Sequence, residues 1–147
     1  MGYPPAMHKD PRFWAAMAAG PLFWLGLFGA GTAVADPAWV LQRPSAFLRV
    51  ALLFPVAEEA VFRGFLQGEL AHRLPRVGIG PLTAANLLTS VLFSLLHLLA
   101  HSPLWAAGVF LPSLAFGYFK DRYGGLAAPI ALHAWYNAGY FALFAGS

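Results

Sequence analysis

Two adjacent acids and an arginine lie within one of the most apolar stretches of this chain. Glu58 and Glu59 follow the uncharged segment 50–57, and Arg63 comes shortly after them. A charged side chain at the centre of a membrane helix costs about 2.5–3.5 kcal/mol on insertion scales, so a segment that only spanned would not carry three. We therefore expect a buried functional site here, with the two glutamates as its acids.

Helical geometry gives the two glutamates different tasks. Glu59 and Arg63 are four residues apart with the acid first, which is the favourable order for an ion pair on one helix face. Glu58 is rotated by about 100° from Glu59, so it can point at another helix. Pro55 removes one backbone hydrogen bond just before the acids and can kink the helix there. The alternative is a structural charge cluster that neutralises itself.

Histidines occur within two later apolar segments. His97 follows Phe93 by four residues, and His133 precedes Asn137 by four residues. Three apolar helices that each carry such groups can line one polar cavity, where a carboxylate activates water and histidines relay protons or donate to an oxyanion. Two histidines and a glutamate can also form a zinc site with an open position. Each histidine alone can equally be a packing residue.

The composition places the chain in the membrane. Of its 147 residues, 59% are hydrophobic and only 10% are charged, whereas soluble domains carry about 25% charged residues. The net charge of +3 suits loops that face anionic lipid. It is too scattered for a nucleic-acid partner, and no nucleic-acid motif is visible. The absence of cysteine excludes disulfides and a cysteine nucleophile.

Five apolar segments predict an all-α fold, a polytopic membrane helical bundle with about five transmembrane helices. Residues 1–147 form one integral membrane domain. The expected helices are 13–35, 46–71, 81–101, 104–119 and 126–145. The first segment resembles a signal peptide as well, because Ala33-Val34-Ala35 looks like a cleavage site. Asn86 and its small polar neighbours in 81–101 are expected to hydrogen-bond between helices.

The polar motifs of these segments resemble a known family, the CAAX prenyl endopeptidase and bacteriocin-processing (CPBP, or Abi) family of glutamate intramembrane proteases. Each motif alone is weak evidence, but all three occur in order on expected membrane helices. They read Glu58-Glu59-Ala60-Val61-Phe62-Arg63, Phe93-Ser94-Leu95-Leu96-His97 and His133-Ala134-Trp135-Tyr136-Asn137. The resemblance covers about residues 46–145, the family's four-helix catalytic core, and leaves the N-terminal helix 13–35 outside it.

The resemblance implies an endopeptidase that hydrolyses a peptide bond of a membrane-anchored protein or peptide. The implied roles are water activation by Glu58 and His97, oxyanion stabilisation by His133 and Asn137, and shaping of the site by Glu59 and Arg63. It implies a mechanism without a cofactor, while a divalent metal such as zinc stays open as the alternative. The implied partners are the membrane-anchored substrate and the lipid bilayer, and the expected location is a bacterial inner membrane.

Two other functions use the same buried polar residues. A non-enzymatic membrane scaffold would keep the fold and bind a partner, but it would not need Glu58, His97, His133 and Asn137 all intact. A small proton or ion carrier would often show an internal repeat, and none is visible.

The basic residues predict the orientation of the chain. On one side of five spans lie Lys9, Arg12, Arg73, Arg76, Lys120 and Arg122, and on the other Arg43 and Arg49. The positive-inside rule then places the N-terminus in the cytoplasm. A topology reporter fused after residue 147 should read as extracytoplasmic, and a cytoplasmic reading would contradict this orientation.

Overall fold

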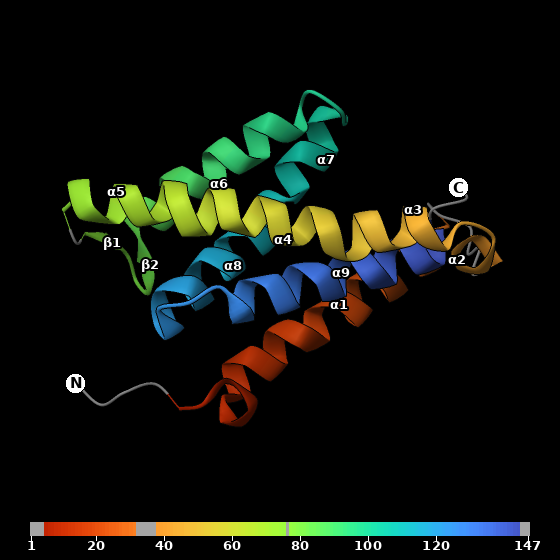
Figure 1. Ribbon diagram of the computed structural model, residues 1–147, viewed down its shortest axis with the longest axis horizontal. Helices are drawn as coiled ribbons and strands as arrows, with labels where there is room; N and C mark the ends of the chain where they lie inside the picture. Colours follow the sequence, from red (N-terminus) through yellow and green to blue (C-terminus); the bar gives the residue numbers. More distant parts are fainter. Residues whose placement is uncertain (1–4, 32–37, 76, 145–147) are drawn as a thin grey trace. The chain divides into compact units, whose positions relative to one another are not determined.

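The computed structural model describes residues 5–31, 38–75 and 77–144, and these residues are almost entirely helical. The all-α class expected from the sequence is therefore confirmed (Figure 1). The helices are α1 (Pro11–Gly29), α2 (Ala38–Gln42), α3 (Pro44–Leu48), α4 (Phe54–Glu59), α5 (Gln67–Arg73), α6 (Ala84–His97), α7 (Pro103–Gly108), α8 (Phe110–Tyr123) and α9 (Ala127–Phe144).

Three further helical stretches depart from α geometry. One 3₁₀ turn, η1 (Met7–Lys9), precedes α1, while η2 (Arg49–Leu53) and η3 (Ala60–Leu66) are π-helical. The two π stretches lie directly before and after α4, so helical residues continue without a gap from Pro44 to Arg73. Because π turns inside helices are frequent at functional sites, this arrangement makes α4, which carries Glu58 and Glu59, a candidate functional segment.

Within the described residues, no single helix combines the length and apolar character needed to cross a membrane. The prediction of about five transmembrane helices is therefore not confirmed by the helices as the structure has them.

Several helix boundaries differ from the expected ones because capping residues override the apolar pattern. The expected helix 81–101 begins only at Ala84, since Leu82–Thr83 (β2) pairs with Gly78–Ile79 (β1) and the Thr83 hydroxyl accepts from the backbone N–H of Asn86 at 3.1 Å. It ends at His97 with Leu98 as its C-cap, and Ser102 then caps the next helix, α7.

The expected end of the helix 104–119 is also wrong. Residues 120–122 lie inside α8, and the chain leaves the helix at Gly124, which has a φ of 71°. Glycine adopts this left-handed conformation without steric cost and commonly ends helices. Lys120 and Arg122 in the last turn favour the helix because cations complement the negative end of its dipole. Asp121, which lies between the expected helices 104–119 and 126–145, is therefore a helical residue.

The described chain divides into two compact units. The central unit comprises residues 58–129, and the terminal unit comprises residues 5–57 together with residues 130–144. The division into units does not test the prediction of one protease domain, which stays a prediction. The possible cleavage site before Asp36 lies outside the described residues.

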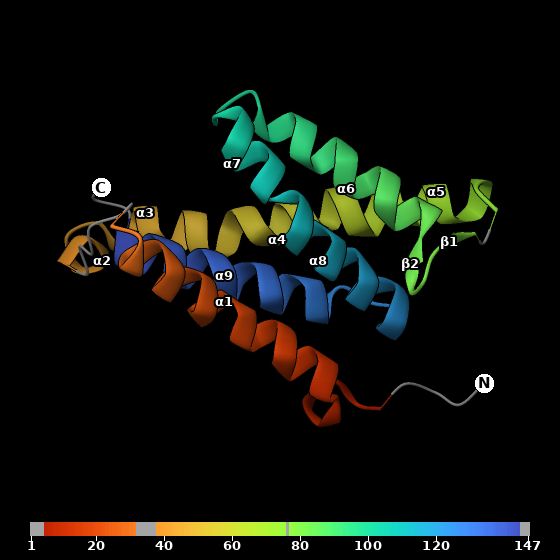
Figure 2. The ribbon, with the colours of Figure 1, turned by 180° about the vertical axis from the view of Figure 1, so that it is seen from behind.

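The central unit is built around the contact of α6 with α8. These two helices pack together. The stretch η3 packs against both of them, and α5 packs against α6 (Figure 2). The buried apolar residues at this contact include Ala85 and Phe93 of α6, and Phe116 and Phe119 of α8.

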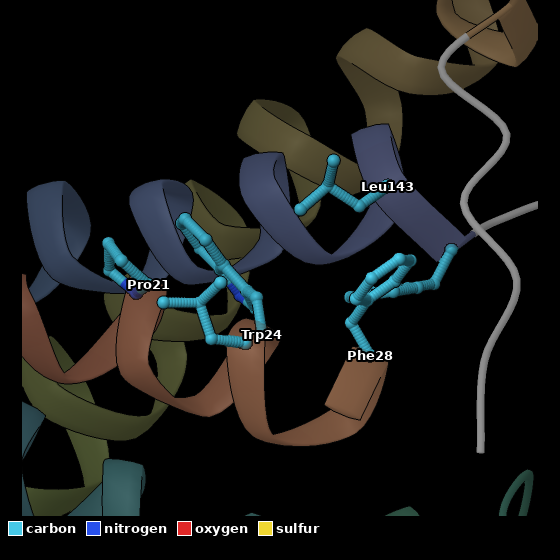
Figure 3. Close-up of a pocket in the computed structure, with 6 residues that line it drawn as sticks. Pro21, Trp24, Phe28 and Leu143 are labelled. Carbon is cyan, nitrogen blue, oxygen red and sulfur yellow. The ribbon is translucent and has the colours of Figure 1, made fainter. Parts of the chain in front are cut away.

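The terminal unit pairs α1 with α9, which lie side by side in both views (Figures 1 and 2). Trp24 packs edge-on against Trp135, with ring centroids 5.2 Å apart. Next to this contact lies an apolar cavity of about 380 Å³, into which Trp24 and Phe28 extend from α1 and Leu143 from α9 (Figure 3). Gly139 makes the close approach possible, because a Cβ there would lie 2.1 Å from the Trp24 ring.

Replacement of Gly139 by alanine should destabilise the terminal unit. The new methyl group has to displace a buried tryptophan, and overpacking of this kind costs about 1–3 kcal/mol. Gly26→Ala in α1 is the matched control, because nothing described lies within 4 Å of its Cβ position. We expect thermal unfolding in detergent to show a lower Tm for Gly139→Ala only, and equal Tm values for the two variants would contradict this packing.

Candidate active site

The central unit contains the buried ion pair that the sequence predicted. The Nε of Arg63 lies 3.3 Å from Oε2 of Glu59, and both side chains have 0% exposure. The guanidinium carbon of Arg63 also lies 4.9 Å from the centroid of the Phe93 ring and 5.7 Å from that of Phe116. Aromatic faces attract a cation when water is excluded. The pairing of Glu59 with Arg63 is thereby confirmed as a contact.

Arg63 also binds α8, which the sequence interpretation missed. Its Nη2 donates to the backbone oxygen of Ser113 at 2.8 Å and to the Ser113 hydroxyl oxygen at 2.6 Å. Hydrogen bonds to a charged donor contribute about 1.5–3 kcal/mol each, roughly twice a neutral bond. Arg63 therefore joins η3 to α8 as well as to Glu59.

A second layer of hydrogen bonds repeats this connection one step further along both helices. The Nε2 of Gln67 donates to the backbone oxygen of Gly117 at 3.0 Å and to Asp121 at 2.8 Å. Thr83 donates to the other carboxylate oxygen of Asp121 at 2.7 Å. The residues involved are spaced by four on each side: Glu59, Arg63 and Gln67 on one, and Ser113, Gly117 and Asp121 on the other. We call this set the polar ladder. The four-residue spacing on each side is visible in the sequence, but the pairing of the two sides, fifty residues apart, is not.

Asn86 forms the interhelical contact expected for α6. Its Nδ2 donates to the backbone oxygen of Leu114 at 3.0 Å, and its Oδ1 accepts from the Ser90 hydroxyl at 3.1 Å. Gly117 is required beside it, because a Cβ at that position would lie 2.0 Å from the Asn86 amide oxygen. The polar contact therefore depends on a glycine that lets α6 and α8 approach closely.

His97 is the last residue of α6, and its ring is oriented by its own helix. Nδ1 lies 2.9 Å from the backbone oxygen of Phe93. Because a carbonyl oxygen only accepts, Nδ1 carries the proton in this bond, and in the neutral ring the lone pair is then on Nε2. The ring packs at 4.5 Å, between centroids, from Phe93 and is half-buried. His97 is thus positioned to accept a proton or hydrogen bond through Nε2.

The two glutamates of α4 differ in their exposure. Glu59 is completely buried at the ion pair, whereas Glu58 is half-buried. A group that reacts with water must be reached by water, so the difference favours Glu58 as the reacting acid and Glu59 as the supporting one.

His133 and Asn137 lie on α9 in the terminal unit. His133 is 6% exposed. Asn137 is half-buried, and its Nδ2 donates to the backbone oxygen of Val50 at 3.0 Å. The structure thus groups Glu58, Glu59, Arg63 and His97 in one compact unit, and His133 with Asn137 in the other. A common site for both groups stays a prediction.

Within residues 5–31, 38–75 and 77–144, no group of three or more His, Asp or Glu side chains is arranged to hold a metal ion. The experiment below tests metal dependence directly.

Arg63→Met should strongly destabilise the protein, because it leaves the Glu59 carboxylate in a buried position without its cation. Removal of one partner of a buried ion pair costs about 3–5 kcal/mol. The Glu59→Gln/Arg63→Met double variant should recover part of this loss, because no charge is then left.

The exposed pair Glu69–Arg73 provides the matched control, since it has the same four-residue spacing and side-chain exposures of 44% and 74%. Arg73→Met should change the free energy of unfolding by less than about 1 kcal/mol. Equal losses for Arg63→Met and Arg73→Met, measured by denaturant unfolding in detergent, would show that the buried pair has no structural role.

Comparison with models of known protein families gives a match. The sequence model of the family described as Type II CAAX prenyl endopeptidase Rce1-like matches residues 39–139, more than two thirds of the chain. No curated protein and no solved structure matches the chain.

Proposed function

The chain belongs to the Type II CAAX prenyl endopeptidase Rce1-like family, and on this basis we propose that it is a CAAX-protease-like intramembrane endopeptidase that uses a glutamate-activated water. The observation that carries the proposal is the extent of the family match. Residues 39–139 include all three polar motifs in their order, so the candidate catalytic residues lie within the part of the chain that defines the family.

In the proposed reaction, the Glu58 carboxylate takes a proton from a water molecule as the water oxygen attacks the carbonyl carbon of the scissile peptide bond. His97 accepts a hydrogen bond from the same water through Nε2. The tetrahedral oxyanion is stabilised by an N–H of His133, and the proton held by Glu58 passes to the departing amine nitrogen. The half-buried state of Glu58 and the orientation of His97 by Phe93 support these two assignments.

The buried ion pair supports the reacting glutamate from the same helix. Glu59 is adjacent to Glu58 in the chain, and its carboxylate is held by Arg63, which is in turn held by Ser113. A side chain can act as a general base only if its backbone is fixed within a fraction of an ångström. We therefore assign Glu59 and Arg63 to positioning of Glu58 and not to contact with substrate.

Membrane location is part of the proposal. Membership in a family of CAAX prenyl endopeptidases supports it, and so do the exposed apolar side chains. Leu99, Leu104 and Leu111 of the central unit are 84%, 85% and 71% exposed, whereas soluble monomers rarely leave large apolar patches in contact with water. The bacterial inner membrane and the cytoplasmic N-terminus remain predictions, and the substrate is a membrane-anchored peptide or protein.

Replacement of Glu58 by glutamine tests the function. The amide keeps the shape of the side chain but cannot take the proton, and loss of a general base typically lowers the rate by about 10²–10⁴-fold. The assay is cleavage of a panel of fluorogenic membrane-anchored peptides, some with a prenylated CAAX end, by protein reconstituted in liposomes. Each preparation is assayed with and without a zinc chelator.

Glu69→Gln is the control for a lost glutamate, because Glu69 is in the exposed pair with Arg73. We expect it to retain activity, and we expect Glu58→Gln to be nearly inactive with an unchanged Tm. A Glu58→Gln protein that cleaves like the parent would exclude the glutamate mechanism. Loss of parental activity in chelator would assign the water activation to a metal.

A further inference from the structure

We propose that Asn137 is a positioning residue, which replaces the backbone hydrogen-bond donor that Pro55 lacks and thereby holds the helix that leads to Glu58. Its catalytic consequence rests on the proposed function. The contact itself does not, because it is a property of the terminal unit that can be measured without a substrate.

The carbonyl that Asn137 binds is left without its helical partner by a proline. In the π stretch η2, the backbone N–H of Phe54 donates to the oxygen of Arg49, five residues earlier. The next carbonyl in this register belongs to Val50, and its donor would be residue 55. Pro55 has no N–H. The Val50 oxygen therefore needs a donor from outside its own helix.

Asn137 supplies that donor. Its Nδ2 lies 3.0 Å from the Val50 oxygen, a normal length for an N–H···O hydrogen bond. Both residues belong to the terminal unit. Buried carbonyl groups are rarely left without a partner in folded proteins, so the position of this asparagine matches a specific need of the backbone.

The same relationship occurs a second time on α9. In α1, Pro21 cannot donate to the backbone oxygen of Met17, four residues earlier. The Met17 oxygen instead accepts from the indole nitrogen of Trp135 at 2.9 Å. Two prolines on two different segments thus each leave a carbonyl oxygen without its helical donor. Both oxygens are bound by side chains of α9, and these two side chains, Trp135 and Asn137, are two residues apart.

The position of Pro55 connects this contact to the chemistry. Pro55 and Glu58 lie three residues apart in the same helix, α4. Loss of the Asn137 donor leaves the chain to find another partner for the Val50 oxygen, which changes the helix geometry just before the reacting carboxylate. Asn137 therefore acts through the placement of Glu58, and one N–H of its amide is already bound to the backbone when a substrate binds.

A double-mutant cycle between Asn137 and Pro55 tests the inference. Asn137→Ala should lower kcat by about tenfold or more, with little change in KM, because the catalytic base is misplaced while the substrate contacts remain. Pro55→Ala restores a backbone N–H, so it should retain activity within a few-fold of the parent. In the Asn137→Ala/Pro55→Ala variant, the Val50 oxygen has a backbone donor again, and most of the lost kcat should return.

Trp135→Phe is the matched control. It removes the equivalent donor from the Met17 oxygen but touches no segment that contains Glu58. We expect it to lower the Tm about as much as Asn137→Ala while kcat stays near the parental value. A double variant as inactive as Asn137→Ala alone would overturn the proposal and would place the asparagine amide at the reacting atoms.

Thermal unfolding of the four proteins of the cycle (the parent, the two single variants and the double variant) tests the contact between Asn137 and the Val50 oxygen independently of activity. The decrease in Tm caused by Asn137→Ala should be clearly smaller in the Pro55→Ala background than in the parent. Equal decreases in both backgrounds would overturn the contact. A parent without any peptidase activity would refute the proposed function, and this stability cycle would still decide whether Asn137 substitutes for the missing donor.

Discussion

The central unit depends on one requirement: a guanidinium placed in an apolar interior must have its charge compensated. Arginine does not lose its proton in proteins, and an isolated buried charge is very unfavourable. The structure compensates this charge with the Glu59 carboxylate, the two Ser113 oxygens that accept from Nη2, and the faces of two phenylalanines, while Nε and Nη1 have no hydrogen-bond partner among the described residues. Because Ser113 lies on α8, satisfying the arginine also fixes α8 against η3. Because α8 also contacts α6 closely at Gly117, the bonds of Arg63 help to hold α8 between η3 and α6.

Much of this could be predicted from the sequence, and the parts that could not have two causes. The all-helical class followed from the apolar segments, and the Glu59–Arg63 contact followed from four-residue spacing on a helix. The interhelical role of Asn86 followed from a polar residue in an apolar helix. Ser113 and Gln67 were missed because they are common surface residue types. Their importance comes from a partner fifty residues away, which spacing within one helix does not show. The boundaries of α6 and α8 were missed because Thr83 and Gly124 override apolar runs.

Three consecutive residues of α9 show how a helix can be held by groups other than its apolar face. Trp135 and Tyr136 donate to the backbone of α1, and Asn137 donates to the backbone of η2. Consecutive residues of an α-helix point about 100° apart, so three of them reach two different neighbours, α1 and η2. Backbone oxygens are present at every residue whatever its side chain. Such contacts can therefore persist when the apolar residues of the partner helix change, provided that the carbonyl remains accessible.

The two π-helical stretches change which sequence spacing places side chains on the same face of the helix. In an α-helix, 3.6 residues complete a turn, so four residues turn through more than a full circle. Side chains spaced by four therefore rotate gradually around the helix axis. In a π stretch each hydrogen bond joins residues five apart, so one turn contains more residues than in an α-helix. Four residues then complete less than one full turn. Between Glu59 and Gln67 the chain passes through η3. A helical wheel drawn with α geometry would place these two side chains roughly 80° apart. The wider turns of η3 counteract this drift, so a straight row of polar groups can form from a spacing that an ordinary helix would wind away from its partner.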